Sequence, residues 1–137
     1  MLEIFARSMR GRAALALAAI SVADPSNRQR LLAVAKDQAQ ILRRSKARYA
    51  LGLACLLEAG VATVRGDRQG ACDFLRHAAV ELEKNELIAW LAVARLGLAR
   101  LVEGEAADQS FRAGMAWMQE QQIRRPECLA RMLFPSI

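Results

Sequence analysis

The chain has 137 residues and a mass of 15.1 kDa, the size of one domain that can hold a core without metal or disulfides. Apolar residues make up 54% of it but aromatic residues only 5%, and 27 alanines supply the difference. Because alanine favours helices and strand-favouring residues are sparse, the composition excludes β-rich folds and predicts an all-α domain. Three widely spaced cysteines argue against a disulfide framework and predict reduced thiols in a cytoplasmic protein.

The net charge of +6 is unevenly distributed along the chain. Residues 1–68 carry 12 basic and 5 acidic side chains, whereas residues 69–137 carry 8 and 9. A basic first half is compatible with nucleic acid, an acidic partner or a membrane surface. Since no aromatic side chains alternate with the basic ones, we favour solvated helix charge over a nucleic-acid ligand. The longest apolar run, residues 50–64, is too short to cross a bilayer.

Apolar residues three or four apart predict a first helix over residues 2–22. Its apolar run after two arginines is similar to a signal peptide, but helical spacing runs through the whole segment, so we expect a helix of the domain. Asp24 can cap a second helix over about 25–45, in which Pro25 fits the first position. A third helix, 47–65, is apolar nearly all round and should therefore lie at the centre.

Gly66 can end the third helix in the left-handed conformation, and Asp67 can cap a fourth that ends near residue 85. A fifth helix, a sixth after Gly104 and a short seventh from Pro126 complete the chain. Breaks at residues 24, 66 and 104 recur every 38 to 42 residues, a period typical of helix-pair solenoids. We expect one domain of antiparallel pairs over about 2–45, 47–85 and 87–122, closed by a helix over 126–133.

The stretch "GDRQGACDFLRHAA" includes Cys72, Asp73 and His77, which raises the question of a metal. Asp73 and His77 lie four residues apart, but zinc needs three or four ligands and the chain has no second histidine. For the same reason a Cys–His nucleophile pair would depend on His77 alone. We therefore predict no metal site, no catalytic residues and no cofactor, and interpret the stretch as a turn followed by an amphipathic helix.

Residues 59–78 resemble the tetratricopeptide repeat, which places small residues and a Gly-Asp turn at fixed positions. The matching residues here are Ala59, Gly66, Asp67, Ala71, Leu75 and Ala78. The next pair matches at Gly97 and Gly104, while Ala62 and Arg100 stand where the repeat commonly has tyrosine. The resemblance implies that the first helix of each pair lines a concave groove. The groove residues would be Leu53, Leu56, Thr63, Leu91 and Ala94.

The segment "WMQEQQIRRPECLARMLFP" resembles the closing segment of large bacterial signalling proteins that join a serine/threonine kinase, an ATPase module and a helical-repeat tail. The shared residues are Trp117, Met118, Gln121 or Gln122, Ile123, Pro126, Met132 and Pro135. The sequence contains no Gly-rich loop and no His-Arg-Asp or Asp-Phe-Gly motif. The resemblance implies a non-catalytic regulatory tail of a larger kinase that binds a protein, a peptide or the parent's other domains.

Several interpretations of the groove and of the chain's role remain open at this stage. A mostly apolar groove would accept a partner helix, unless helices of a preceding repeat cover it. An open apolar face on the first helix would also allow a homo-oligomer. The alternatives to an interaction module are a nucleic-acid-binding module that uses the basic first half, and a structural spacer or dimerisation domain. The densest basic patch consists of Arg43, Arg44, Lys46 and Arg48.

Overall fold

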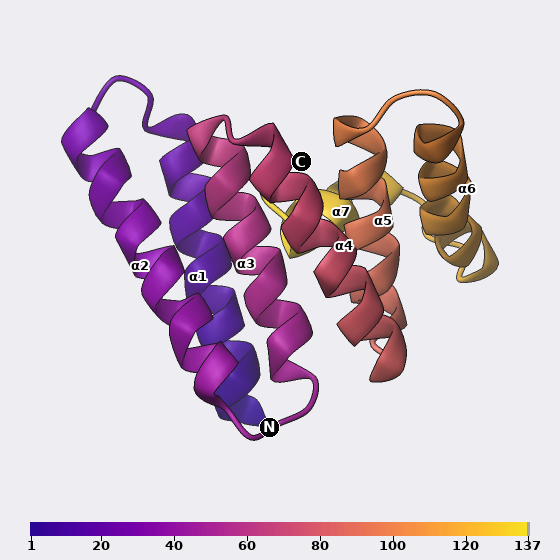
Figure 1. Cartoon of the computed structure of the whole chain (residues 1–137), viewed down its shortest axis with the longest axis horizontal. Helices are drawn as coiled ribbons and strands as arrows, with labels where there is room; N and C mark the ends of the chain where they lie inside the picture. The colour runs from indigo at the N-terminus through magenta and orange to yellow at the C-terminus, as the bar shows by residue number, and fades with distance from the viewer. Residues whose placement is uncertain (137) are drawn as a thin grey trace.

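The computed structural model describes residues 1–136 and contains seven helices and no strand in that range (Figure 1). The all-α prediction is confirmed. The helices are α1 (Leu2–Ile20), α2 (Pro25–Arg44), α3 (Ala50–Arg65), α4 (Arg68–Lys84), α5 (Ile88–Leu101), α6 (Glu105–Glu120) and α7 (Pro126–Leu133). None of the helices among these residues is long and apolar enough to pass through a membrane.

The breaks between helices follow from local chemistry. The carboxylate of Asp24 accepts a hydrogen bond from the main-chain N–H of Asn27 at 3.0 Å, so α2 has a capped start with proline at its first position. Gly66 ends α3 in the left-handed conformation with φ of 78°. Asp67 then caps α4 by accepting from the main-chain N–H of Gly70 at 2.9 Å. These two turns set the spacing between the helix pairs.

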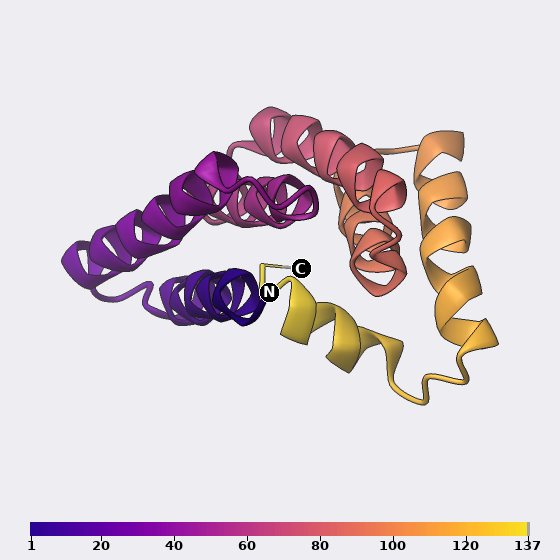
Figure 2. The ribbon, with the colours of Figure 1, turned by 90° about the horizontal axis from the view of Figure 1, so that it is seen from below.

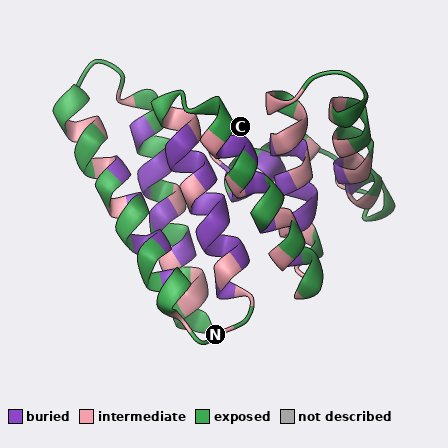
Figure 3. Cartoon of the chain, in the orientation of Figure 1, coloured by how far each residue is buried: buried purple, intermediate pink, exposed green. Residues whose placement is uncertain are grey.

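The helices pack in chain order, each against the next, from α1 to α6. The third helix begins at Ala50, three residues later than its spacing predicts, because residues 45–49 form a turn in which the Ser45 hydroxyl accepts from the Ala47 N–H. As predicted, α3 lies at the centre: it contacts α1, α2 and α4, and eleven of its sixteen residues are buried (Figure 3). An apolar surface on all sides requires this arrangement.

The chain's last helix folds back under the array. Figure 2 shows α1, α3 and α5 forming one layer and α2, α4 and α6 the other, while α7 returns beneath α5 and brings residues 134–136 beside α1 and α3. In this arrangement α7 contacts α5, and α1 contacts α3. The inner side of the helix array is therefore the side that the C-terminal segment occupies.

Close packing of α5 on α6 depends on Gly114. A Cβ atom at this position would lie 2.8 Å from the main-chain oxygen of Ala92 and 2.8 Å from Cγ of Leu96. Because the first neighbour is backbone, α6 must move away to make room for even one methyl group.

We predict that Gly114→Ala lowers the free energy of unfolding by about 1–3 kcal/mol, measured by urea denaturation. The sign of the change is decisive. At an exposed helix position the same substitution stabilises by about 1 kcal/mol, because alanine is the better helix former. A stabilised variant would therefore contradict the close approach of α5 and α6.

Candidate functional site

The residues after α7 end in an aromatic side chain that the array buries. Phe134 is only 3% exposed, and its ring lies against two glycines of the inner layer. A Cβ added to Gly60 of α3 would lie 3.4 Å from the ring, and one added to Gly97 of α5 would lie 3.1 Å from it. The absence of side chains at these positions thus leaves a slot between α3 and α5 that one phenyl ring fills.

The flanking residues extend this contact along α3. Leu133 and Pro135 line a narrow crevice that also includes Leu53 and Leu56. On the other side of the ring, the Ser136 hydroxyl donates to the main-chain oxygen of Gly60 at 3.4 Å. Residues 133–136 therefore occupy the inner side of α3 over several turns, and we call them the C-terminal plug.

Arg12 of α1 holds the end of α7, just before the plug, against α1 and α5. Arg12 donates from Nη1 to the main-chain oxygen of Met132 at 2.8 Å, and its guanidinium lies over the Trp90 ring, 4.7 Å from the centroid. Burial lowers the pKa of Arg12 from its usual value, but arginine stays cationic at physiological pH. The positive charge of Arg12 is therefore stabilised by the negative face of the Trp90 ring and by a main-chain carbonyl oxygen, rather than by a carboxylate.

The structure brings most of the predicted groove residues to this plug. Leu53 and Leu56 are buried beside Leu133, and Thr63 lines a small cavity of about 40 Å³ with Phe134 and Ser136. Leu91 and Ala94 are buried in α5. Leu53, Leu56 and Thr63 thus lie along one concave side of α3, a groove that the chain's own C-terminal residues cover. Cover by helices of a preceding repeat, the alternative considered above, is not needed to explain this burial.

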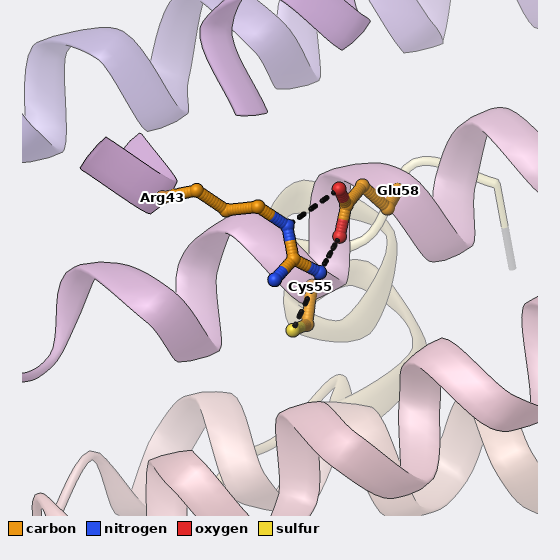
Figure 4. A network of polar contacts seen from close by, with 3 residues as sticks. All are labelled: Arg43, Cys55 and Glu58. Atoms are coloured by element: carbon orange, nitrogen blue, oxygen red, sulfur yellow. Dashed lines mark hydrogen bonds and ion pairs between the residues drawn. The ribbon is translucent and has the colours of Figure 1, made fainter. Parts of the chain in front are cut away.

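The basic patch divides into one paired and three exposed residues. Arg43 forms a bidentate contact with Glu58 of α3, at 2.8 Å from Nε to Oε1 and 2.5 Å from Nη2 to Oε2 (Figure 4). Hydrogen bonding to Glu58 raises the pKa of Arg43. Arg44, Lys46 and Arg48 lie exposed around the turn between α2 and α3. Arg43 thus ties α2 to α3, and the remaining positive charge faces solvent.

Cys55 lies under the Arg43–Glu58 pair, with its sulfur 3.7 Å from Nη2 of Arg43 (Figure 4). Burial raises the pKa of the Cys55 thiol to about 11, an effect larger than the opposing influence of the guanidinium. The thiol therefore stays protonated at neutral pH and packs as a small apolar group, which makes it a poor nucleophile.

The three residues considered as metal ligands, Cys72, Asp73 and His77, lie in different environments on α4. Cys72 is buried in the core, whereas Asp73 is exposed, accepts from Gln69 and pairs with Arg76 at 3.3 Å. His77 is exposed on α4. Within residues 1–136, no three His, Cys, Asp or Glu side chains gather closely enough to hold a metal ion.

A second hollow opens beside the plug, between α5, α6 and α7. It has a volume of about 510 Å³ and a mainly apolar lining, and Phe111 on its α6 wall is 54% exposed. Arg100, Asp108 and Glu127 supply polar groups in its wall. Because α7 contributes Pro126 and Ala130 to this hollow and Leu133 to the crevice beside the plug, the hollow and the covered groove are neighbours along one short helix.

Four residues of the site lie outside the sequence-based predictions: Arg12, Gly60, Trp90 and Phe134. The sequence does carry a signal for the slot, because Gly60 and Gly97 are 37 residues apart, close to the helix-pair period. A glycine repeated at the same place in two inner helices marks a close approach from the concave side. Arg12 and Trp90 offer no comparable signal, since their contact depends on the return of α7.

No protein-family model matches the chain, and no curated protein or solved structure shows significant similarity to it.

The Arg12 contacts predict how readily the C-terminal segment detaches. Arg12→Met keeps the apolar stem but removes the charged hydrogen bond and the cation–π contact, which together contribute roughly 2 kcal/mol. We expect trypsin to cleave between Arg124 and Arg125 and after Arg131 at least about tenfold faster, because cleavage follows the open population. Arg10→Met, two residues away on the exposed side of α1, is the matched control. Equal cleavage rates in both variants would show that Arg12 does not hold the plug.

The cysteines should differ sharply in reactivity. Cys128 is exposed, whereas Cys55 and Cys72 are buried and the Cys55 pKa is about 11. At pH 8 a disulfide reagent such as DTNB should therefore modify one thiol rapidly, and Cys128→Ser should abolish that phase. The other two thiols should react only after unfolding in urea. Rapid labelling of two or three thiols in the native protein would contradict the packing around α3.

Proposed function

We propose that this chain is a non-catalytic protein–protein interaction module whose concave groove binds a short apolar segment of a partner protein. The observation that supports the proposal is the plug itself. Residues 133–136 lie along α3 as a peptide would, with a phenyl ring in the slot formed at Gly60 and Gly97. A surface that accepts one apolar segment of its own chain has the shape and chemistry to accept another.

The plug also indicates which features a partner segment needs. The slot takes one aromatic ring, and the crevice beside Leu53 and Leu56 takes aliphatic or proline side chains. Arg12 donates to a main-chain carbonyl oxygen, an acceptor that every peptide offers. Binding energy would come from burial of the ring and its apolar neighbours, while Arg12 would fix the direction of the segment.

The plug and a partner segment would compete for the same surface. A tethered competitor acts at an effective concentration of about millimolar, so the free groove would be exposed only for a small fraction of the time. Departure of α7 would also remove one wall of the hollow beside α5 and α6, including Pro126 and Ala130. The partner would then meet a single continuous apolar surface that extends from α1 to Phe111.

The resemblance to the tails of bacterial serine/threonine kinases supports the proposal that this module belongs to a signalling protein. Three residues of that resemblance, Pro126, Met132 and Pro135, belong to the segment that covers the groove. We therefore extend the proposal to the C-terminal region of a kinase-type protein, with another domain of the parent or a separate protein as partner. Release of the C-terminal segment would be the regulated step.

Binding of the chain's own C-terminal sequence as a free peptide tests the groove directly. A fluorescent peptide of residues 131–137 should bind Phe134→Ala at least about tenfold more tightly than the unmodified chain, because the variant lacks the tethered ring. Fluorescence anisotropy measures both dissociation constants. A peptide with alanine in place of its phenylalanine should bind neither protein.

Val80→Ala is the control variant, since Val80 is 55% exposed on α4 and lines neither the groove nor the hollow beside it. It should leave peptide affinity close to that of the unmodified chain. If Phe134→Ala, shown to be folded by circular dichroism, does not bind the peptide, the groove is not a peptide site. Equal binding to the unmodified chain and to Phe134→Ala would show that the plug does not compete.

A further inference from the structure

One face of α1 is apolar, and no element among residues 1–136 covers it. Leu2, Met9 and Ile20 are 88%, 62% and 77% exposed, whereas the opposite side of the helix is buried against the array. Figure 2 shows α1 in the end pair of the array, below α2 and α3, with open space beneath it. We call this surface the outer face of α1. It consists of Leu2, Ala6, Met9, Ala13, Ala16, Leu17 and Ile20, all exposed.

The outer face has the spacing of a coiled-coil seam. Its residues at positions 2, 6, 9, 13, 16 and 20 alternate in steps of four and three, and no polar or charged residue interrupts them. This heptad spacing gives a straight apolar seam that fits a second helix at a small crossing angle. The charged residues Glu3 and Arg10 lie along one edge, where such seams usually carry charge.

The order of residues along the seam points to a second copy of the same helix. When two copies of the helix are aligned antiparallel with residue 11 at the centre, residues of one copy lie opposite residues of the other. Leu2 then lies opposite Ile20, Ala6 opposite Ala16, and Met9 opposite Ala13. Every seam position therefore maps onto another seam position. Near the centre, the long Met9 side chain of each copy lies opposite the small Ala13 side chain of the other copy, so the two helices can interdigitate. A two-fold axis needs this self-complementarity, whereas an unrelated partner does not.

The size of the face sets the strength of such a pair. The helix has 19 residues, so it is about 28 Å long, and a contact strip about 10 Å wide covers roughly 280 Å² on each copy, or about 560 Å² over both copies. This area is below the roughly 1,000 Å² of a stable specific interface, so the contact corresponds to a weak, reversible dimer.

We infer that α1 pairs with α1 of a second copy in an antiparallel coiled coil centred at residue 11. The two Arg10 side chains then face each other across the two-fold axis, because edge residues of the same type meet in antiparallel pairs. Their repulsion, together with the net charge of +6 on each copy, opposes association at low ionic strength. Added salt therefore strengthens the dimer.

Sedimentation equilibrium from about 1 to 500 µM tests the pairing. The chain should be a reversible dimer, and Ala13→Glu should raise its dissociation constant at least about tenfold by placing a charge in the seam. Ala33→Glu makes the same change at an exposed position of α2 and should leave the constant unchanged. Circular dichroism verifies that both variants are folded. A chain that stays monomeric throughout, or equal loss in both variants, would overturn the inference.

A charge-swap mixture tests the antiparallel geometry. Arg10→Glu alone should dimerise weakly, as like charges again meet at the axis, but mixed with the unmodified chain it should form a heterodimer at least about threefold tighter than either homodimer. Fluorescence resonance energy transfer between labelled copies measures all three constants. The absence of any preference for the heterodimer would overturn the antiparallel register. Neither measurement depends on peptide binding in the concave groove.

Discussion

The arrangement of this domain depends on the need to cover α3 on every side. Eleven of its sixteen residues are buried, and they are spread around the whole circumference of the helix. The helix pairs provide α1, α2 and α4 as neighbours, which leaves the concave side still to be covered. Apolar surface on that side would be exposed to water at a cost of about 25 cal/mol per Å². The return of α7 and the burial of Phe134 against Gly60 remove that cost within one chain.

The cover that α7 and Phe134 provide is held by fewer contacts than the rest of the core. The contacts between successive helices run along whole helices, whereas α7 has eight residues and holds its place through one ring, one arginine and a few flanking contacts. Segments with few buried contacts open at a lower free energy than the global unfolding. The plug is therefore the part of the domain suited to detach while the helix pairs stay folded, and the surface that it leaves is the one a partner would need.

The sequence was sufficient for the fold. Helical spacing, the Asp24 and Asp67 caps and the glycines at 66 and 104 act within a few residues, so the seven helices could be predicted with small errors, such as the late start of α3 at Ala50. Leu53 and Leu56 were assigned to the concave side by the tetratricopeptide resemblance, and in the structure both line the crevice beside the plug. Their cover could not be predicted, since contacts between Arg12, Trp90 and Met132 join segments up to 120 residues apart.

Amide hydrogen exchange of α7 tests the central claim most directly. At the end of α7, the main-chain N–H of Phe134 donates to the main-chain oxygen of Ala130 at 2.7 Å. An isolated eight-residue helix is unstable in water, so this hydrogen bond persists only while α7 stays docked on the domain. We predict that amides 130–134 exchange at least about 100-fold more slowly than an unstructured peptide, yet faster than the amides of α3. Exchange of α7 at the unstructured rate would show that the groove is open. Exchange as slow as that of α3 would show that the plug does not detach by itself.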